Sequence, residues 1–357
     1  MVAYQPTHCC ARWLRKVTTV ETVTARTEDT VAPGGSIDDR GGAVRRPRLG
    51  IRYVVTILAL LAASSCGEGH RPPSANGPDS PGASPGPTAT QTGNDDVPTV
   101  ISAGDFHKQH FTESTSIDNH WLPLEPGTRL VFEGAANDDD GVRHPTRDVF
   151  IVTDLTKTVD GVRTVVVWDR DYSNGSLVEA ELALFAQDDS GNVWLLGEYP
   201  EEYEAGEIVD APTWISGLQR ARAGVAMPAV PGRGTPSYAA GWAPAVEFTD
   251  RSRVSRVGRH TCVPAGCFDD VVVIDEFNPD EPGSHQLKYY APGNGNVRVG
   301  WSGAKDEAKE VLTLIERSTL STEEVAAARA GALALEESGF RLSPHVYAMT
   351  ERSMPLT

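Results

Sequence analysis

Residues 149–168, VFIVTDLTKTVDGVRTVVVW, contain the clearest indication of the fold class of this chain. Two runs of β-branched and aromatic residues, 149–153 and 163–168, flank Asp160-Gly161, a dipeptide typical of a tight hairpin turn. Similar runs, separated by short turns, lie at 129–133, 177–185, 193–196, 251–257, 268–274, 286–290, 297–301 and 310–316. Strand runs without alternating helices predict a mainly β domain, with one antiparallel sheet that is twisted or barrel-like.

One helix is expected near the C-terminus, at residues 322–337. The sequence Ser-Thr-Glu-Glu at 321–324 is a capping box, an Ala-rich stretch follows, and Gly339 is placed to end the helix. Residues 212–245 contain many Gly, Pro and Ala residues. We expect them to form a long, irregular segment that covers one face or mouth of the sheet.

Residues 44–66, VRRPRLGIRYVVTILALLAASSC, have the layout of a lipoprotein signal peptide. A basic stretch precedes an apolar run of about eleven residues, and a membrane-spanning helix needs roughly 20. Ala-Ser-Ser-Cys at 63–66 resembles a bacterial lipobox. This resemblance implies that residues 44–65 are removed and that Cys66 then carries the lipid, which includes palmitate. The alternative is a buried apolar strand or helix.

The remaining N-terminal residues have no fold pattern. Residues 1–43 match no export signal, and we expect translation to start near Val44. Residues 66–100 begin with the lipidated cysteine and continue as a stretch rich in Pro, Gly and Ser. Such a sequence buries too little apolar surface to fold, so we expect a disordered tether. Residues 101–357 are expected to form a single β-rich domain.

The charge of the chain limits its partners. The formal net charge is -17, and residues 67–357 alone hold 23 Lys and Arg against 44 Asp and Glu, which gives -21. Nucleic-acid binding relies on neutralising phosphates with basic side chains, so no nucleic-acid partner is expected. The expected partners are the membrane, through the lipid, and an unknown small molecule. No cofactor is expected.

Two cysteines, Cys262 and Cys267, bracket the turn-forming sequence Val-Pro-Ala-Gly. Outside the cytoplasm a disulfide is the expected state of such a pair. The alternative is a metal site with His260 as third ligand, although the spacing is longer than the usual C-x2-C.

Three motifs resemble a widespread family of exported bacterial proteins and lipoproteins to which no activity is assigned. They are Ile-Asp-Asn at 117–119 followed by LPLEPGT at 122–128, AQDDSGNVWLLGE at 186–198, and KYYAPG at 288–293. The resemblance spans roughly residues 106–350 and implies a mostly antiparallel β fold. Two family features are missing, since Ala183 and the pair Ala239-Ala240 stand where the family usually has an acid and a Gln-Glu pair.

Three histidines near the start of the domain are candidate metal ligands. His107 and His110 are spaced to share a helix face, and His120 follows ten residues later. Imidazoles in this arrangement suit zinc or copper. The alternative is a set of polar residues in the loop that leads into the domain.

The central motif supplies the candidate ligand-binding residues, which are Gln187, Trp194 and Glu198, together with Tyr289. An aromatic side chain and acids on fixed faces of a strand can line a shallow pocket, although a strand Trp is more often part of the core. The acids of residues 188–192 suggest calcium, but the sixth position is Val193 rather than the glycine of an EF-hand. A hairpin turn with Gly191 or Asn192 at positive φ explains these residues more simply.

Carboxylates on neighbouring strands offer a second kind of site. Asp169, Asp171, Glu179 and Glu198 could supply a carboxylate pair for hydrolysis, and Asp188 is a further candidate. The sequence does not fix their separation.

We therefore expect a cell-envelope lipoprotein, anchored at the outer face of the cytoplasmic membrane. Its domain would be a non-catalytic binding protein for a small apolar or amphiphilic ligand, because such sites are concave and mostly apolar. The alternatives are a secreted hydrolase with paired carboxylates and a purely structural surface protein.

Overall fold

The computed structural model describes residues 106–138, 141–280, 282–304 and 309–356. Residues 1–43, the signal peptide at 44–65, Cys66 and the linker at 66–100 lie outside the described residues, so their assignments stay predictions. Within the described part, no helix has the length and apolar character needed to cross a membrane.

The described strands form one sheet in which neighbouring strands run antiparallel. The strand order is β10-β8-β5-β4-β3-β2-β1-β15-β14-β13-β12-β11-β9, with β6 and β7 paired to β5 and β16 paired to β2. The strands are β1 (Thr128–Asn137), β2 (Arg143–Val159), β3 (Val162–Ser173), β4 (Ser176–Gln187), β5 (Val193–Glu204), β6 (Glu207–Asp210), β7 (Trp214–Ile215), β8 (Arg222–Met227), β9 (Tyr238–Ala239), β10 (Gly241–Trp242), β11 (Arg251–Val263), β12 (Gly266–Phe277), β13 (His285–Ala291), β14 (Gly295–Ser302), β15 (Glu310–Thr319) and β16 (Met354–Pro355). The mainly β, barrel-like fold with one C-terminal helix is confirmed.

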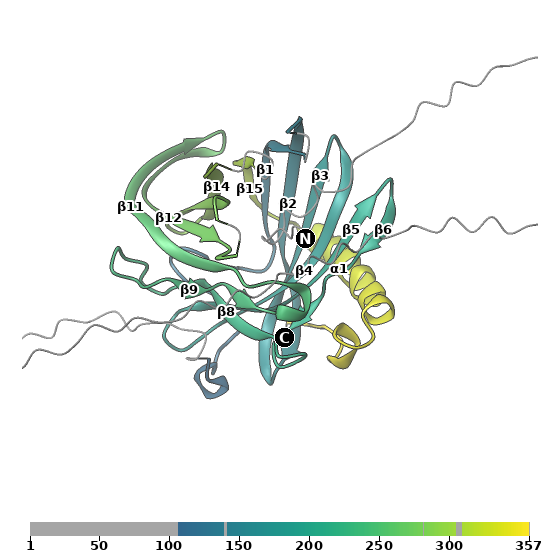
Figure 1. Cartoon of the computed structure of the whole chain (residues 1–357). Coiled ribbons are helices and arrows are strands. Elements are labelled where there is room, and N and C mark those ends of the chain that lie inside the picture. The colour runs from purple at the N-terminus through teal and green to yellow at the C-terminus, as the bar shows by residue number, and fades with distance from the viewer. Residues whose placement is uncertain (1–105, 139–140, 281, 305–308, 357) are drawn as a thin grey trace, which may run out of the picture. The chain divides into compact units, whose positions relative to one another are not determined.

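Two meanders build this sheet, β1 to β5 and β11 to β15, and they join where β1 pairs with β15. At the far edges, β9 pairs with β11 and β10 pairs with β8. Only Ala240 separates β9 from β10, so one continuous segment ties the two edges together. The sheet therefore curves until it nearly closes (Figure 1).

The segment 212–245 differs from its prediction as an irregular cover. It contains β7, β8, β9 and β10, which extend the sheet and join its edges. The absence of a side chain at Gly224 allows β8 to lie close to the segment between β9 and β10. A Cβ at this position would lie under 3.0 Å from the backbone of Ala240 and Gly241. A Gly- and Ala-rich sequence weakens the strand pattern while it permits this close approach.

The hairpin that gives the clearest indication of the fold class is present as predicted. Asp160 and Gly161 have φ of 49° and 82°, and Val159 pairs with Val162 across the turn. Positive φ at both central residues defines the turn type whose twist matches that of the flanking strands.

The helix α1 (Thr322–Leu342) begins at the predicted capping box. The Ser321 hydroxyl accepts a hydrogen bond from the Glu324 backbone N–H, and the Glu324 carboxylate accepts one from the Ser321 N–H. The prediction that Gly339 ends the helix was wrong, since α1 continues to Leu342. A Cβ at Gly339 would lie 2.8 Å from Tyr347 Cδ1 and 3.2 Å from Tyr199 Cδ1, so this glycine permits close packing rather than a stop.

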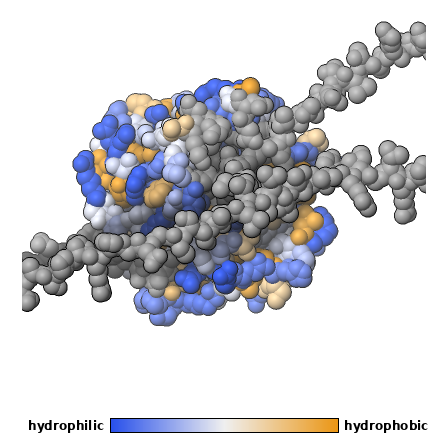
Figure 2. Space-filling view, viewed as in Figure 1, coloured by the Kyte–Doolittle hydropathy of each residue, from blue (hydrophilic) through white to orange (hydrophobic). Residues whose placement is uncertain are grey.

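The two faces of the sheet have different cores. On the outer face α1 packs over β2 and β4, and Leu155, Leu184 and Leu335 belong to the shared cluster (Figure 1). On the inner face the side chains of both meanders, such as Val167 and Ile274, meet across the interior. The visible exterior mixes hydrophilic and apolar areas (Figure 2).

Candidate functional site

A cavity of about 160 Å³ lies inside the curved sheet, lined by strands of both meanders. Much of its wall is apolar. The apolar lining includes Leu122, Leu124, Leu130, Phe132, Phe150, Val152, Ala183, Phe185, Leu195, Phe248, Val299 and Leu312. The polar lining includes six carboxyl side chains and one lysine, which are Asp148, Asp169, Glu181, Glu198, Asp250, Glu276 and Lys288.

Strand register explains why the acids gather on β2, β3 and β4. Asp148 pairs with Asp171, Asp171 pairs with Glu179, and Asp169 pairs with Glu181. Residues two apart on a strand share a face, so two rows of carboxyl groups cross the inner face of these strands. Ionised groups of like charge that lie directly opposite destabilise a sheet.

Burial, and then the crowding of like charges, raises the pKa of several of these acids. Burial raises the pKa of Asp148 well above its ordinary range, and the neighbouring Asp169 raises it further. Burial likewise raises the pKa of Asp171, to which the charge of Asp148 adds, and the pKa of Glu179, to which Glu181 adds. Burial and like charge therefore both favour the protonated form of these carboxyl groups.

Glu198 on β5 faces the cavity from the adjacent wall. Burial raises its pKa to about 8, although the Trp214 indole and the positive charge of Lys288 both act to lower it. The Trp214 Nε1–H donates to Glu198 Oε2 at 2.7 Å. Ala183, where the resembled family usually has an acid, lies directly opposite Glu198 on β4.

The opposite wall comes from β12 and β13. Gln286, Lys288 and Tyr290 alternate along β13, and all three line the cavity. Lys288 Nζ lies 2.8 Å from Glu276 Oε2 on β12. Burial raises the pKa of Tyr290 far above its ordinary value, so its hydroxyl stays protonated.

Two buried acceptor atoms of the cavity wall have no hydrogen-bond partner among the described residues. They are Asp148 Oδ1 and Gln286 Oε1. A buried acceptor without a donor costs roughly 1–3 kcal/mol. Both atoms would be satisfied by a ligand that donates hydrogen bonds.

Of the four predicted ligand-binding residues, Glu198 lines the cavity and Trp194 does not. Leu184 pairs with Gly197 while Phe185 pairs with Leu195, so Leu196 is an extra residue in β5. Such a β-bulge switches the face of the residues that follow it. Trp194 consequently packs in the outer core, where its Nε1–H donates to Asp188 Oδ2 at 2.8 Å. Strict alternation would have placed Trp194 and Glu198 on the same face.

Gln187 and Tyr289 also lie away from the cavity lining. Gln187 Oε1 accepts from the Asn119 N–H at 2.9 Å, and its Nε2 donates to Asp118 Oδ1 at 2.6 Å. The Gln187 side chain thus holds residues 118 and 119, near the start of the domain, in place through these two hydrogen bonds. Tyr289 points away from the cavity because its neighbour Tyr290 takes the inward position, and Arg298 lies over its ring.

The three predicted histidine ligands do not converge. The rings of His107 and His110 lie 5.4 Å apart, while the ring of His120 packs against Trp121. In the described ranges, the one group of three metal-type ligands within 4.8 Å of one another is His260 with Cys262 and Cys267. Those two cysteines form the expected disulfide.

Asp188 has a structural role in its turn, as the simpler interpretation of residues 188–192 predicts. Its Oδ1 accepts from the Ser190 and Asn192 N–H groups at 2.9 Å, and Gly191 has φ of 87°. The carboxylate therefore holds the turn and the Trp194 indole, and it lies away from the cavity lining.

The sequence indicated part of this site. Asp169 and Glu198 were candidates, and the pairs at 169/171 and 179/181 carry a readable signal, because acids two apart in an apolar strand share one face. Asp250, just before β11, and Glu276 on β12 carry no such signal, since only the closure of the sheet brings them to the cavity.

Comparison with known proteins gives limited information. No protein-family model matches the chain, and no curated protein matches it. One similar solved structure, named as an exported protein with YmcC-like fold from Bacteroides fragilis NCTC 9343, is 14% identical over 56% of this chain and 99% of that chain, with a TM-score of 0.34. Another, named as a lipoprotein from Parabacteroides distasonis ATCC 8503, is 14% identical over 56% of this chain and 100% of that chain, with a TM-score of 0.30. These likenesses assign neither a family nor a function to the chain.

Proposed function

We propose that the domain binds a small amphiphilic cation in its interior cavity, without catalysis, at the cell envelope. The observation that carries this proposal is the composition of the cavity wall, which is apolar over much of its area and carries six carboxyl groups against one lysine. The envelope location rests on residues 44–66, with Cys66 as the lipid anchor.

The volume of the cavity limits the ligand to a compact one. An engineered apolar cavity of about 150 Å³ admits benzene, and the cavity here measures about 160 Å³. The apolar part of the ligand is therefore one small ring or a short chain. Phe150, Phe185 and Phe248 supply contact surface for it.

The carboxyl groups of the cavity wall favour a ligand with a cationic head group. An ammonium group donates three hydrogen bonds, and Asp148 Oδ1 and Gln286 Oε1 are acceptors without donors among the described residues. A cation beside carboxyl groups whose pKa is raised favours their ionised form. Binding should therefore release protons, and affinity should rise with pH through the range in which these groups titrate.

Benzylammonium, benzyl alcohol and benzoate form a matched set of probes for isothermal titration calorimetry. We expect benzylammonium to bind with the highest affinity, and Asp169→Asn to weaken it about tenfold, or roughly 1.4 kcal/mol. Glu207→Gln, which removes an exposed carboxylate on β6, is the matched control and should bind like the wild type. Equal binding of the alcohol and the ammonium would contradict the proposed head group, and no binding of any probe would contradict the proposed site.

Carboxylate-based hydrolysis is the second candidate function. The observation that favours it is the register that sets Asp169 opposite Glu181 on the neighbouring strand, since two carboxyl groups on one face can divide the acid and base roles. Turnover of a chromogenic ester or glycoside that is lost in Asp169→Asn but kept in Glu207→Gln would favour the hydrolase over the binding protein.

A further inference from the structure

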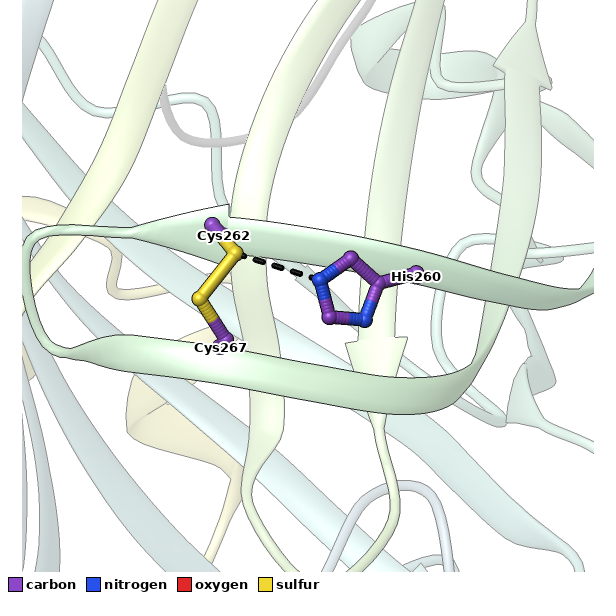
Figure 3. Close-up of side chains that lie close together, drawn as sticks. All are labelled: His260, Cys262 and Cys267. Atoms are coloured by element: carbon purple, nitrogen blue, oxygen red, sulfur yellow. Dashed lines mark hydrogen bonds between the residues drawn. A yellow bond between two sulfur atoms is a disulfide. The ribbon is translucent and has the colours of Figure 1, made fainter.

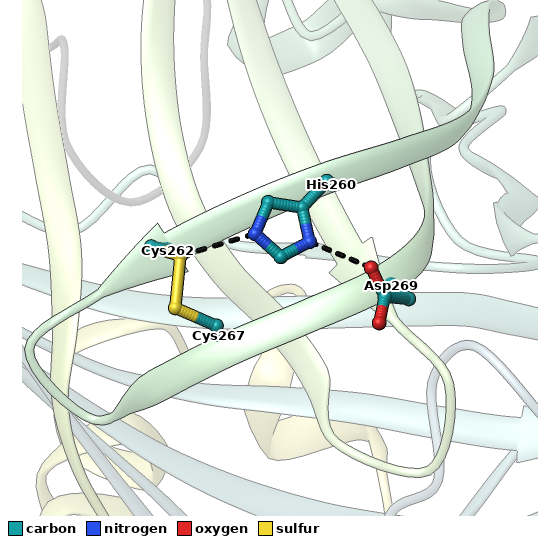
Figure 4. Close-up of a disulfide and its surroundings, with 4 residues drawn as sticks. All are labelled: His260, Cys262, Cys267 and Asp269. Atoms are coloured by element: carbon teal, nitrogen blue, oxygen red, sulfur yellow. Dashed lines mark hydrogen bonds and ion pairs between the residues drawn. A yellow bond between two sulfur atoms is a disulfide. The ribbon is translucent and has the colours of Figure 1, made fainter.

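A second group of chemically active side chains lies outside the cavity, at the tip of the β11–β12 hairpin. Cys262 pairs directly with Cys267, and their sulfur atoms form the disulfide. His260 lies two residues before Cys262 and shares one face of the hairpin with the two cysteines (Figure 3). Asp269 lies two residues after Cys267 and belongs to the same face (Figure 4). The side chains of His260 and Asp269 are 62% and 84% exposed, which leaves this face accessible.

The geometry of His260 is that of a metal ligand with its supporting carboxylate. Asp269 Oδ1 lies 2.6 Å from His260 Nδ1, and His260 Nε2 lies 3.3 Å from Cys262 Sγ (Figure 4). A carboxylate only accepts hydrogen bonds, so Nδ1 is the donor, and the neutral ring has its lone pair on Nε2. Metal-bound histidines commonly donate their other N–H to a carboxylate in this way.

The hairpin has other contacts that hold the two cysteines together. The backbone pairs of Cys262 with Cys267 and of Val263 with Gly266 lie next to the turn. Val263 and Phe268 pack against an apolar cluster that includes Phe132, and the Ala265 N–H donates to the Leu314 carbonyl at 3.1 Å. Reduction of the disulfide should therefore leave both sulfur atoms close to His260 Nε2.

We propose that this hairpin tip is a redox-controlled zinc site. In the reduced state the thiolates of Cys262 and Cys267 and the Nε2 atom of His260 bind Zn²⁺, with water as the fourth ligand. Two cysteines and one histidine with an open fourth position form a known zinc donor set. Oxidation of the thiols removes two of the three ligands, so the disulfide form does not hold the metal.

The chemistry balances with a dithiol as the reductant. The dithiol supplies two electrons and two protons, the bond between Cys262 Sγ and Cys267 Sγ breaks, and the reductant forms its own disulfide. Zn²⁺ then replaces the two thiol protons, which pass to solvent.

Zinc titration of the full-length chain tests this proposal. The protein is reduced with a dithiol, freed of reductant without oxygen, and titrated with Zn²⁺ against a chromophoric chelator. The chain also contains Cys9, Cys10 and Cys66, so the matched control is the double variant Cys262→Ser/Cys267→Ser, which keeps those three thiols. We expect the reduced wild type to bind one Zn²⁺ per chain more than this control, and the oxidised wild type to bind no more than it.

Single variants test the roles of the histidine and the carboxylate. His260→Ala should weaken the extra site at least tenfold, and Asp269→Asn should weaken it by about 10- to 100-fold as the loss of a supporting carboxylate does. His345→Ala removes an exposed histidine elsewhere and should change nothing. Equal zinc stoichiometry in the reduced wild type and the double serine variant would overturn the proposal, as would full affinity in His260→Ala.

Discussion

Replacement of Glu198 by Gln should change how the stability of the domain depends on pH. Glu198 is buried, its pKa is raised to about 8, and it accepts a hydrogen bond from the Trp214 indole. A glutamine has nearly the same shape, keeps an oxygen acceptor for the indole and carries no ionisable group. The substitution therefore removes the titration and leaves the packing nearly unchanged.

The direction in which stability changes with pH follows from proton binding in the folded and unfolded states. In the unfolded chain Glu198 ionises near 4.5, whereas in the folded protein it keeps its proton up to about 8. Between these values the folded state binds more protons, so the free energy of unfolding falls as pH rises. At roughly 1.4 kcal/mol per pH unit, this single group lowers the stability of the wild type by about 5 kcal/mol between pH 4.5 and pH 8. Above pH 8 the loss levels off.

Urea unfolding at constant ionic strength, followed by tryptophan fluorescence from pH 4.5 to pH 8.5, measures this effect. Asp148, Asp171 and Glu179 also have raised pKa values and add to the wild-type slope. The informative quantity is therefore the stability of Glu198→Gln minus that of the wild type. We expect this difference to grow with pH by up to about 5 kcal/mol.

Glu207→Gln provides the control, because it removes an exposed carboxylate and should follow the wild type at every pH. Parallel stability curves for Glu198→Gln and the wild type would show that Glu198 does not have a raised pKa in the folded protein. A variant that becomes less stable than the wild type as pH rises would contradict the raised pKa more strongly, since Glu198 would then be ionised in the folded protein and stabilised by Lys288.

Two further predictions concern other parts of the chain. Lys157→Ala should lower the free energy of unfolding by about 3–5 kcal/mol, measured in urea titrations. The buried Lys157 Nζ donates to Glu336 Oε1 at 2.8 Å, and removal of the amine leaves that buried carboxylate without this cation. A decrease of less than about 1 kcal/mol would contradict the importance of this ion pair for stability. Cys66→Ser should abolish incorporation of labelled palmitate and move the protein from the membrane to the soluble fraction, and unchanged labelling would exclude Cys66 as the anchor.

The elements of the fold were predictable because local physics determines them. The Asp160-Gly161 turn needs positive φ at two successive residues, and the Ser321 capping box needs a hydroxyl and a carboxylate three residues apart. Both requirements can be read from a few consecutive residues. The same holds for the Cys262–Cys267 disulfide, whose partners lie across one short turn.

The site was harder to predict because long-range pairing decides which face a residue occupies. The extra residue Leu196 in β5 sends Trp194 to the outer core and Glu198 to the cavity, although simple alternation places them together. Gly339 similarly suggested the end of a helix, whereas its lack of a side chain serves the contact with Tyr347.

Local sequence patterns were sufficient to predict the strand-rich class, the hairpin turns and the start of the C-terminal helix. Each of these depends on neighbours in the chain. By contrast, the gathering of carboxyl groups from β2, β3, β4, β5 and β12 in one small cavity with Lys288 depends on the folded arrangement of the strands. Closure of a curved sheet brings together residues more than 100 positions apart, and burial then raises the pKa of acids that would be ordinary carboxylates in an extended chain.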